Sequence, residues 1–500
     1  MEYWGSLKLG NVFLCLKKQF EMQSQSKVQP VNSKHLCTGK MQNPSSELLS
    51  DEKEFIAHFV SLYDDKRFTD LMLRVGGCRY AVHKFVLITS SEVFEAMLGQ
   101  KSWKEAEEAE ISLTEEEECI PVFDLFLRYL YSGSIQMTTD IVLPVLLLAD
   151  KYGIKVLRES CIDYMLRHIV ESPDTNRTLT WYQYAKMTSQ DELQELCLKF
   201  ILSNFDIILQ APDWLEMTKL ELVEFLSSSE LIVENEIHLW NRVEAWLCSE
   251  HNKESLQENL ESILPLIRFT MILPKDLLHL ESSSFFSEHH DMFAEKLNLG
   301  YKHHSLAIDS GAVTSKEELY RNYYSADYGL CYSFKLDKYN SVNKIESRIS
   351  IDCDIPVQFM PTSHKKTSQQ IIPLQFVFYP KGYFTTITLY GTYLGRQSDS
   401  TSLRLLKRLQ PDRPPIKVQL TLVLFGMKNK VKYVASTYNQ ETVICKDNLE
   451  LFVENVIDIS KLTQDDCPYL IHGNLEGKVF IKVQDCGFHL LEEKASQKHD

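Results

Sequence analysis

Paired histidines are the residues whose type most suggests chemistry in this sequence. His289-His290 and His303-His304 carry imidazole nitrogens, which bind zinc and related metals. Adjacent side chains point in different directions on a helix or a strand, so such pairs rarely chelate one ion. A zinc site also needs cysteine or carboxylate partners at suitable spacing. We therefore interpret both pairs as solvated surface residues and expect neither a metal nor a cofactor.

The sequence holds none of the short motifs that mark common catalytic sites. It contains no Gly-x-Gly-x-x-Gly loop, no phosphate-binding P-loop, no His-Glu-x-x-His metalloprotease motif and no Gly-x-Ser-x-Gly nucleophile elbow. Their joint absence, together with the interaction modules described below, leads us to expect that this chain is not an enzyme.

The charge and hydropathy of the chain bound its partners and its location. The 500 residues carry a formal net charge of −16, whereas binding to nucleic-acid phosphates requires a basic face. No apolar run reaches the ~18 residues that a membrane-spanning helix needs. The amino-terminal apolar stretch, Val12–Leu16, is shorter than the core of a secretory signal. We expect no nucleic-acid or membrane partner and a cytoplasmic location, with secretion as the alternative if a signal was missed.

Residues 68–133 contain the clearest signals of local structure. Leu71, Leu73 and Val75 alternate with other residues at the period of a strand. Gly76-Gly77 follow, and because glycine adopts positive φ freely, they predict a tight hairpin turn. A helix is expected to begin behind Lys84. No residue in this segment has a catalytic appearance, so the segment is better interpreted as an interaction module.

The same segment resembles the BTB/POZ domain family. The shared features are Phe68-x-Asp70, Gly76-Gly77, Ala81-x-His83-Lys84, Leu87, Ser90, Phe94, Leu130-Tyr131-Ser132-Gly133 and Ala149-Asp150-Lys151-Tyr152. The resemblance implies an α/β domain that forms a homodimer. It also implies that Asp70, His83 and Lys84 form a charged pocket near the dimer face. A purely structural pairing that folds the hairpin is the alternative, because a buried carboxylate must be paired or hydrogen-bonded.

The tripeptide Trp103-Lys104-Glu105 points to a second partner. By resemblance, BTB adaptors that bind a cullin carry a hydrophobic-x-Glu tripeptide between the helix after His-Lys and the next strand. The match implies that Trp103 is the hydrophobic anchor and Glu105 the charged third position of a cullin contact. Aromatic side chains are frequent interface anchors. The alternative is an exposed acidic loop in which a tryptophan occurs by chance.

The middle of the chain, from residue 171 to about 290, has apolar residues at helical spacing. Breaks such as Ser172-Pro173 and Ala211-Pro212 indicate short helices with brief connections. The pattern resembles the BACK domain that often follows BTB. We expect Trp240 and Trp246 to pack in its core and not to stack on a ligand.

After about residue 310 the apolar period changes to that of strands. Val418, Leu420, Leu422 and Leu424 alternate with other residues, and glycines and prolines separate the strands. Many short half-buried strands of this kind predict an antiparallel β-sandwich. No repeat of ~50 residues marks a kelch propeller. The tail resembles the TRAF-like (MATH-like) sandwich, and we expect it to recruit an unknown protein substrate.

The predicted fold class is multidomain α+β, with a BTB/POZ α/β domain, an all-α BACK domain and a C-terminal antiparallel β-sandwich of the TRAF/MATH-like kind. The expected organisation is a disordered segment at 1–48, BTB at 49–170, BACK at 171–295, a linker at 296–314, the sandwich at 315–490 and a disordered tail at 491–500.

Two functions compete on this evidence. The first is a homodimeric substrate adaptor of a cullin-RING ubiquitin ligase. The second is a scaffold unrelated to ubiquitin and secreted, as the resemblance to the galectin-3-binding-protein family implies. Twelve scattered cysteines without a Cys-x-x-Cys pair fit a reduced cytosolic protein. Their even number and the sequon Asn176-Arg177-Thr178 fit the secreted alternative.

Overall fold

The computed structural model describes residues 51–99, 108–306, 320–325, 330–356, 371–389, 392–407, 416–445, 450–462, 464 and 467–485. The expected disordered segments 1–48 and 491–500 lie outside these residues. The chain divides into two units: Met1–Tyr164 with Gln183–Asp191, and Met165–Tyr182 with Glu192–Asp500.

The sheet of the first unit follows directly from the alternation in the sequence. Its strands, in the order β2-β1-β3, are β1 (Leu71–Val75), β2 (Cys78–Val82) and β3 (Glu110–Leu113). β1 and β2 pair antiparallel with Leu71 opposite Val82, and β3 pairs with β1 in parallel. Gly76 and Gly77 turn the hairpin at φ values of 54° and 87°, a region that suits glycine. The fully buried Leu73 shows which face of the sheet meets the core.

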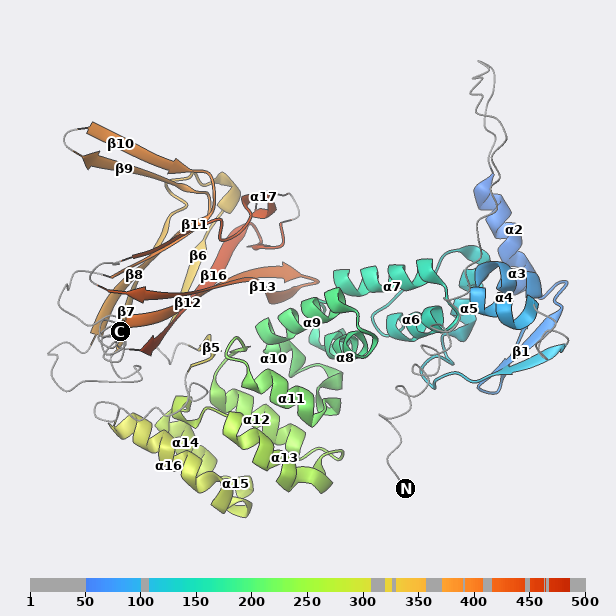
Figure 1. The fold of residues 1–500 in the computed structure, drawn as a ribbon, viewed down its shortest axis with the longest axis horizontal. Coiled ribbons are helices and arrows are strands. Elements are labelled where there is room, and N and C mark those ends of the chain that lie inside the picture. Colours follow the sequence, from blue (N-terminus) through green and yellow to red (C-terminus); the bar gives the residue numbers. More distant parts are fainter. Residues whose placement is uncertain are drawn as a thin grey trace, which may run out of the picture. The chain divides into compact units, whose positions relative to one another are not determined.

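Helices pack beside this sheet and bury an aromatic core (Figure 1). They are α2 (Glu52–Asp64), α3 (Lys84–Ser90), α4 (Glu92–Gly99), α5 (Phe123–Ser132), α6 (Val142–Lys151) and α7 (Lys155–Arg167). Phe94 of α4 stacks on Tyr152 with ring centroids 4.4 Å apart, and Phe126 of α5 lies 5.5 Å from the same ring. Because aromatic side chains bury large areas, this cluster is a main source of stability for the domain.

Short helices make up the middle of the chain, as their apolar spacing predicts. They are α8 (Thr178–Thr188), α9 (Asp191–Ser203), α10 (Phe205–Ile208), α11 (Lys219–Ser227), α12 (Glu236–Leu247), α13 (Leu256–Ile263), α14 (Pro274–Glu281), α15 (Ser284–Glu288) and α16 (His290–Leu306). Trp240 and Trp246 of α12 are 1% and 0% exposed, which confirms that they pack in the core. Thr218 and Glu221 form a reciprocal capping box that starts α11.

Helix α16 differs from the predicted organisation. Residues 296–306 were expected in a linker, but they belong to a helix that continues to Leu306. Phe293 and Leu297 of this helix are buried, and Phe293 contacts Trp240 at a ring distance of 5.2 Å. The helix therefore belongs to the packed helical region, because its apolar residues close the core around α12.

The described C-terminal residues form two larger antiparallel sheets and a separate two-stranded one, made of β9 (Tyr383–Leu389) and β10 (Thr392–Ser398). The strands of the larger sheets are β6 (Cys331–Leu336), β7 (Ile349–Pro356), β8 (Ile371–Tyr379), β11 (Ser402–Lys407), β12 (Ile416–Lys428), β13 (Val431–Ile444), β14 (Glu450–Glu454), β15 (Leu470–Ile471) and β16 (Asn474–Asp485). A short helix, α17 (Ile459–Leu462), follows β14.

The strand order of the two larger sheets confirms an antiparallel sandwich (Figure 1). One sheet has the order β14-β11-β8-β7, and the other has β13-β12-β16-β15 with β6 beside β16. Phe334 of β6 contacts Phe378 of β8 across the two sheets, with ring centroids 6.0 Å apart. The alternating residues Leu420 and Leu422 of β12 face the same core. Among the described residues, no helix is long and apolar enough to cross a membrane.

Candidate functional site

The predicted pocket residues Asp70 and Lys84 meet at the start of α3. The Asp70 carboxylate accepts a hydrogen bond from the Lys84 main-chain N–H at 2.7 Å. The residue that precedes the helix, His83, makes no capping bond with its side chain. Asp70 therefore does the work of an N-cap residue from across the hairpin, because it satisfies an N–H that the first helical turn leaves unpaired.

His83 lies inside the domain and is held from both sides of its ring. Its Nε2 is 2.7 Å from the Arg67 carbonyl oxygen, and its Nδ1 is 2.9 Å from the Tyr131 hydroxyl. A carbonyl only accepts, so Nε2 donates, and in the singly protonated ring Nδ1 accepts from Tyr131. The main-chain N–H of His83 also donates to the Tyr131 hydroxyl, at 3.0 Å. Burial raises the pKa of Tyr131 to about 12, which keeps this donor protonated.

The structure thus brings Asp70, His83 and Lys84 together, and it gives each a role in holding the hairpin to α3 and α5. Their place beside a dimer face stays a prediction. The other predicted site residues, Trp103 and Glu105, lie in the segment 100–107, which is outside the described residues. In the sequence, this segment lies between α4 and β3.

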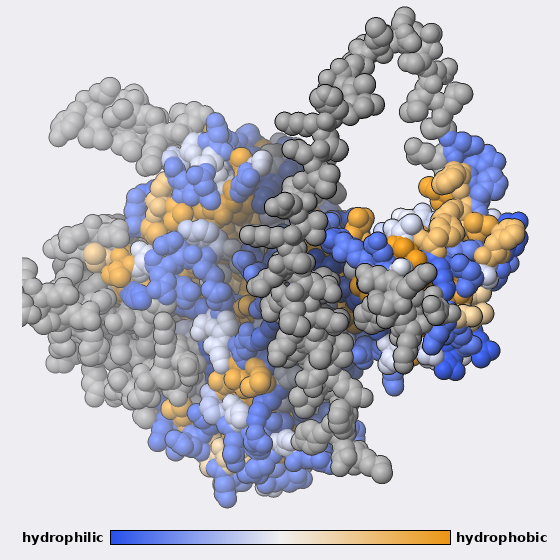
Figure 2. Space-filling model, turned by 45° about the vertical axis from the view of Figure 1, so that its right-hand side comes forward, coloured by the Kyte–Doolittle hydropathy of each residue, from blue (hydrophilic) through white to orange (hydrophobic). Residues whose placement is uncertain are grey.

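Four apolar side chains beside this group form a surface that the sequence analysis did not identify. We call Phe55, Ile56, Phe59 and Phe85 the BTB aromatic patch. Phe55 is 70% exposed and Phe85 is 51% exposed. The Phe59 ring lies between them, with centroids 6.2 Å from Phe55 and 5.9 Å from Phe85. Apolar residues gather on the visible face of this part of the molecule in Figure 2.

A shallow groove adjoins the patch between α2 and α5. Its volume is about 470 Å³, and Ile56, Ser61 and Ser132 are among the residues that line it. An ion pair between Asp64 and Arg128 lies on its wall. A contiguous exposed apolar surface with a polar rim is typical of a protein contact. The signal that could have revealed it is the width of the apolar face of α2, which exceeds a single buried stripe.

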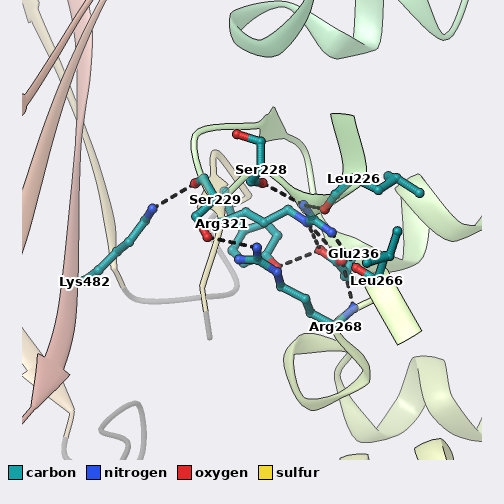
Figure 3. A network of polar contacts seen from close by, with 9 residues as sticks. Leu226, Ser228, Ser229, Glu236, Leu266, Arg268, Arg321 and Lys482 are labelled. Carbon is teal, nitrogen blue, oxygen red and sulfur yellow. Dashed lines mark hydrogen bonds and ion pairs between the residues drawn. The ribbon is translucent and has the colours of Figure 1, made fainter. Parts of the chain in front are cut away.

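A second group of polar residues is buried in the other unit, around Glu236 (Figure 3). Glu236 is the first residue of α12 and is 0% exposed. Arg321 donates from Nε to both carboxylate oxygens, at 3.1 Å and 3.2 Å. The Tyr323 hydroxyl donates to Oε2 at 2.7 Å, and the Arg268 main-chain N–H donates to Oε1 at 2.9 Å. Four hydrogen bonds thus compensate the buried carboxylate.

The guanidinium of Arg321 is satisfied just as fully. Nη1 donates to the main-chain oxygens of Leu226 and Ser228 at 2.6 Å and 3.0 Å, and Nη2 donates to that of Leu266 at 2.7 Å. The residues that follow form strand β5 (Asn322–Tyr323), which pairs in parallel with β4 (Ile232–Val233). The segment before the sandwich is therefore fixed to the helical region by main-chain pairing and by a buried ion pair.

Lys482 adds a contact from the sandwich itself. This residue of β16 is 6% exposed, and its Nζ donates to the Ser229 main-chain oxygen at 3.0 Å. Arg268 donates to the Ser229 hydroxyl at 3.1 Å. Burial, together with the smaller effect of the nearby charge of Arg268, lowers the pKa of Lys482 to about 7. The ammonium form is therefore disfavoured where helices and sandwich meet (Figure 3).

Histidines, cysteines and acidic residues elsewhere in the described ranges are the other residues whose type could do chemistry. No group of three or more His, Cys, Asp or Glu residues there could hold a metal ion. The described cysteines are free thiols. Burial raises the pKa of Cys119 and Cys161 to about 12, so neither supplies the thiolate that nucleophilic or redox chemistry requires. His303, interpreted from sequence as solvated, is half-buried, and burial lowers its pKa to about 4.

Comparison with protein families identifies three domains in the order that the fold shows. Residues 59–169 match the BTB/POZ domain, residues 178–281 match the domain described as BTB And C-terminal Kelch (BACK), and residues 318–488 match the BTBD17 TRAF domain. The predicted fold class is confirmed: a BTB domain, a BACK helical region and a TRAF sandwich with antiparallel strands. These are interaction domains by description, and none is described as catalytic.

The chain also resembles named proteins. BTB/POZ domain-containing protein 17 of Xenopus laevis is 23% identical over 460 residues, which cover 89% of this chain and 91% of that protein. The human protein of the same name is 29% identical over 52% of this chain and 54% of its own length. Galectin-3-binding protein of Mesocricetus auratus is 30% identical over 49% of this chain and 42% of its own length. The resemblance therefore extends over most of the chain.

Proposed function

We propose that this BTB–BACK–TRAF chain is a homodimeric scaffold that acts as a substrate adaptor of a cullin-RING ubiquitin ligase. Its BTB domain pairs with a second copy and holds the cullin, and its TRAF sandwich recruits the protein to be modified. The chain itself performs no chemistry. It raises the effective concentration of the substrate near the ligase, and binding energy is sufficient for that task.

The observation that carries the proposal is the BTB aromatic patch. A 70% exposed Phe55 and a 51% exposed Phe85 leave apolar rings in water in a single copy of the chain. Burial of such rings in an interface recovers about 25 cal/mol for each Å² removed from water. A second copy presents the same rings, so a two-fold contact buries both sets at once. The neighbouring His83 and Asp70 support this surface by fixing the start of α3.

The cullin contact rests on Trp103 and Glu105, by similarity to cullin-binding BTB adaptors. Purified full-length protein should retain the cullin amino-terminal domain in a pull-down, and Trp103→Ala plus Glu105→Ala should abolish retention. Ser102→Ala plus Glu107→Ala changes flanking residues of the same segment and should leave retention intact. Equal retention by both double variants, or no retention by the unmodified protein, would remove the adaptor role and leave a scaffold.

A secreted scaffold is the second candidate, because galectin-3-binding protein is among the relatives. We infer a cytoplasmic location in preference, since the free Cys78 and Cys248 are exposed and fit a reducing compartment. Expression in cultured cells, with glycosidase treatment of medium and lysate, separates the two. Asn176 is 1% exposed and its side chain bonds the main chain of Ile169 and Thr178, so the folded chain does not present this sequon to a glycan. Protein that accumulates in the medium would support secretion and overturn the cytoplasmic assignment.

A further inference from the structure

Lys482 of β16 is a buried lysine that has no carboxylate at ion-pair distance among the described residues. The residue is 6% exposed, and the hydrogen bond that the described part of the chain gives its Nζ goes to the Ser229 main-chain oxygen, at 3.0 Å. A buried cation is normally paired with an anion, as Arg321 is with Glu236. The geometry around Lys482 therefore favours the neutral amine over the ammonium form.

The charged side chains around Lys482 act on it in both directions. Burial is the main cause that lowers its pKa to about 7, and among the nearby charges Arg268 has the largest effect. Arg321 acts in the same direction, whereas Glu230, which precedes β4, and Glu441 of β13 oppose it. A lysine with this pKa is mostly neutral at about pH 8, whereas a lysine with the ordinary value of 10.5 is almost fully protonated there.

A neutral primary amine is a nucleophile, and an amine buried this deeply selects a small electrophile. Carbon dioxide is uncharged and very small, so it can reach an Nζ that enzymes and larger acyl donors cannot. The lone pair of Nζ attacks the carbon and forms an N–C bond, while one C–O π bond breaks and leaves a negative oxygen. The nitrogen then releases one proton to water. The product is a carbamate, –NH–COO⁻, and neither an oxidant nor a reductant takes part.

The surroundings of the Lys482 Nζ suit a carbamate better than an ammonium group. The nitrogen keeps one N–H, which can still donate to the Ser229 oxygen. The hydroxyl of Ser229 accepts a hydrogen bond from Arg268 Nη2 at 3.1 Å, so a guanidinium lies on the other side of this residue (Figure 3). Guanidinium groups favour anions with two oxygens, because their N–H donors match that geometry. Arg268 therefore attracts the carbamate, whereas it repels the ammonium form.

We propose that Lys482 is a site of reversible carbamate formation with carbon dioxide, and that the carbamate strengthens the contact between the TRAF sandwich and the BACK helices. Lys482 belongs to the sandwich, whereas Ser229 and Arg268 belong to the helical region. The modification replaces a group that the neighbouring guanidinium repels by one that it attracts. This inference goes beyond the scaffold function and requires neither a cullin nor a dimer.

The test traps the carbamate on the full-length protein. The protein is equilibrated with carbon-13 bicarbonate at about pH 8 in a sealed vessel, treated with triethyloxonium to convert carbamates into stable ethyl esters, digested and analysed by mass spectrometry. Lys432 is the internal control, because it is half-exposed and pairs with Glu476 at 2.7 Å in the same sheet. We expect the labelled ester on Lys482 to exceed that on Lys432 by about tenfold or more. The excess should disappear when the protein is unfolded in urea.

Two variants connect the carbamate to its surroundings. Arg268→Gln removes the nearer guanidinium and should lower the trapped fraction on Lys482, with circular dichroism as the check on folding. At constant pH and ionic strength, bicarbonate should raise the urea midpoint of the unmodified protein and of Lys432→Met, but not that of Lys482→Met, because carbon dioxide then binds the folded chain selectively.

Three results would overturn the inference. The first is an absence of label on Lys482, and the second is equal labelling of Lys482 in folded and urea-unfolded protein. The third is labelled Lys482 with no rise in the urea midpoint, which would remove the carbamate from the contact between sandwich and helices. None of these results alters the cullin pull-down, so the two proposals fail separately.

Discussion

The BTB aromatic patch and the buried polar residues around Glu236 differ in what they expose to water. The patch leaves apolar rings such as Phe55 in water, whereas the second group removes the charges of Glu236 and Arg321 from water completely. Exposed apolar area is a surface kept for a partner. Buried, fully paired charge contributes little net stability but penalises every arrangement that separates the pair. The first region therefore indicates association between molecules, and the second indicates fixed internal geometry between BACK and the segment that leads into the TRAF sandwich.

Among substitutions in these two regions, replacement of Arg321 should cause the largest loss of stability. Arg321→Ala leaves the Glu236 carboxylate buried without its counter-charge, and we expect the free energy of unfolding to fall by about 3–5 kcal/mol. Urea denaturation monitored by circular dichroism measures the change. Arg404→Ala, which breaks a half-exposed ion pair with Glu450, should cost no more than about 1 kcal/mol. Equal losses in both variants would contradict the distinction between buried and exposed pairs.

Charge placed on the patch should act on association and leave folding almost unchanged. Phe55→Asp plus Phe85→Asp puts carboxylates at a two-fold contact, so the dissociation constant of the dimer should rise by about 100-fold or more. Light scattering at micromolar concentration measures the mass. Leu220→Asp alters an equally apolar, 78% exposed side chain elsewhere and should remain dimeric. A dimer that survives the double substitution would place the interface outside the patch.

The sequence alone predicts much of this fold, but not the exposed patch or the buried ion pair. Hydrophobic period and glycine placement located the β1–β2 hairpin and the core tryptophans, because these depend on neighbouring residues. The pairing of Glu236 with Arg321 spans 85 positions, and no local pattern announces which distant charge will compensate a buried one. The exposure of Phe55 was missed for a related reason, since the sequence shows that the residue is apolar but not whether anything covers it.

Lys482 offers a pH-dependent test of the buried region. Its pKa is lowered to about 7 in the fold, from 10.5 as the ordinary value. Below pH 7, Lys482 is protonated in both the folded and the unfolded chain, so folding must bury its ammonium group and stability is lowest. Between about pH 7 and 10.5 the folded chain has lost this proton and the unfolded chain has not, so stability rises with pH. From pH 7 to 9, stability should rise by about 2 kcal/mol relative to Lys482→Met. Urea unfolding of both proteins at the two pH values measures this difference, and parallel profiles would contradict it.

Replacement of Asp70 should cause the smallest loss of stability. It distinguishes a residue that caps α3 from a residue of a pocket at the dimer face. Asp70→Ala removes the acceptor for the Lys84 N–H, so we expect a loss of about 1 kcal/mol in stability, as for other helix caps. Thermal denaturation measures the loss, and light scattering should still report a dimer. Asp70→Asn keeps an acceptor oxygen and should recover most of the stability. A monomeric but fully stable Asp70→Ala protein would instead assign Asp70 to the dimer face.

Because Glu236 and Arg321 are far apart in the sequence, they also leave the ribosome at different times. The carboxylate emerges from the ribosome 85 residues before its guanidinium partner. At about 5–20 residues per second, translation separates the two by about 4–17 s. During this interval the BACK helices cannot bury Glu236 with its charge compensated. The helical region is therefore completed late, once the polypeptide has passed residue 321, and a nascent chain that pauses within this window presents unfinished helices to chaperones.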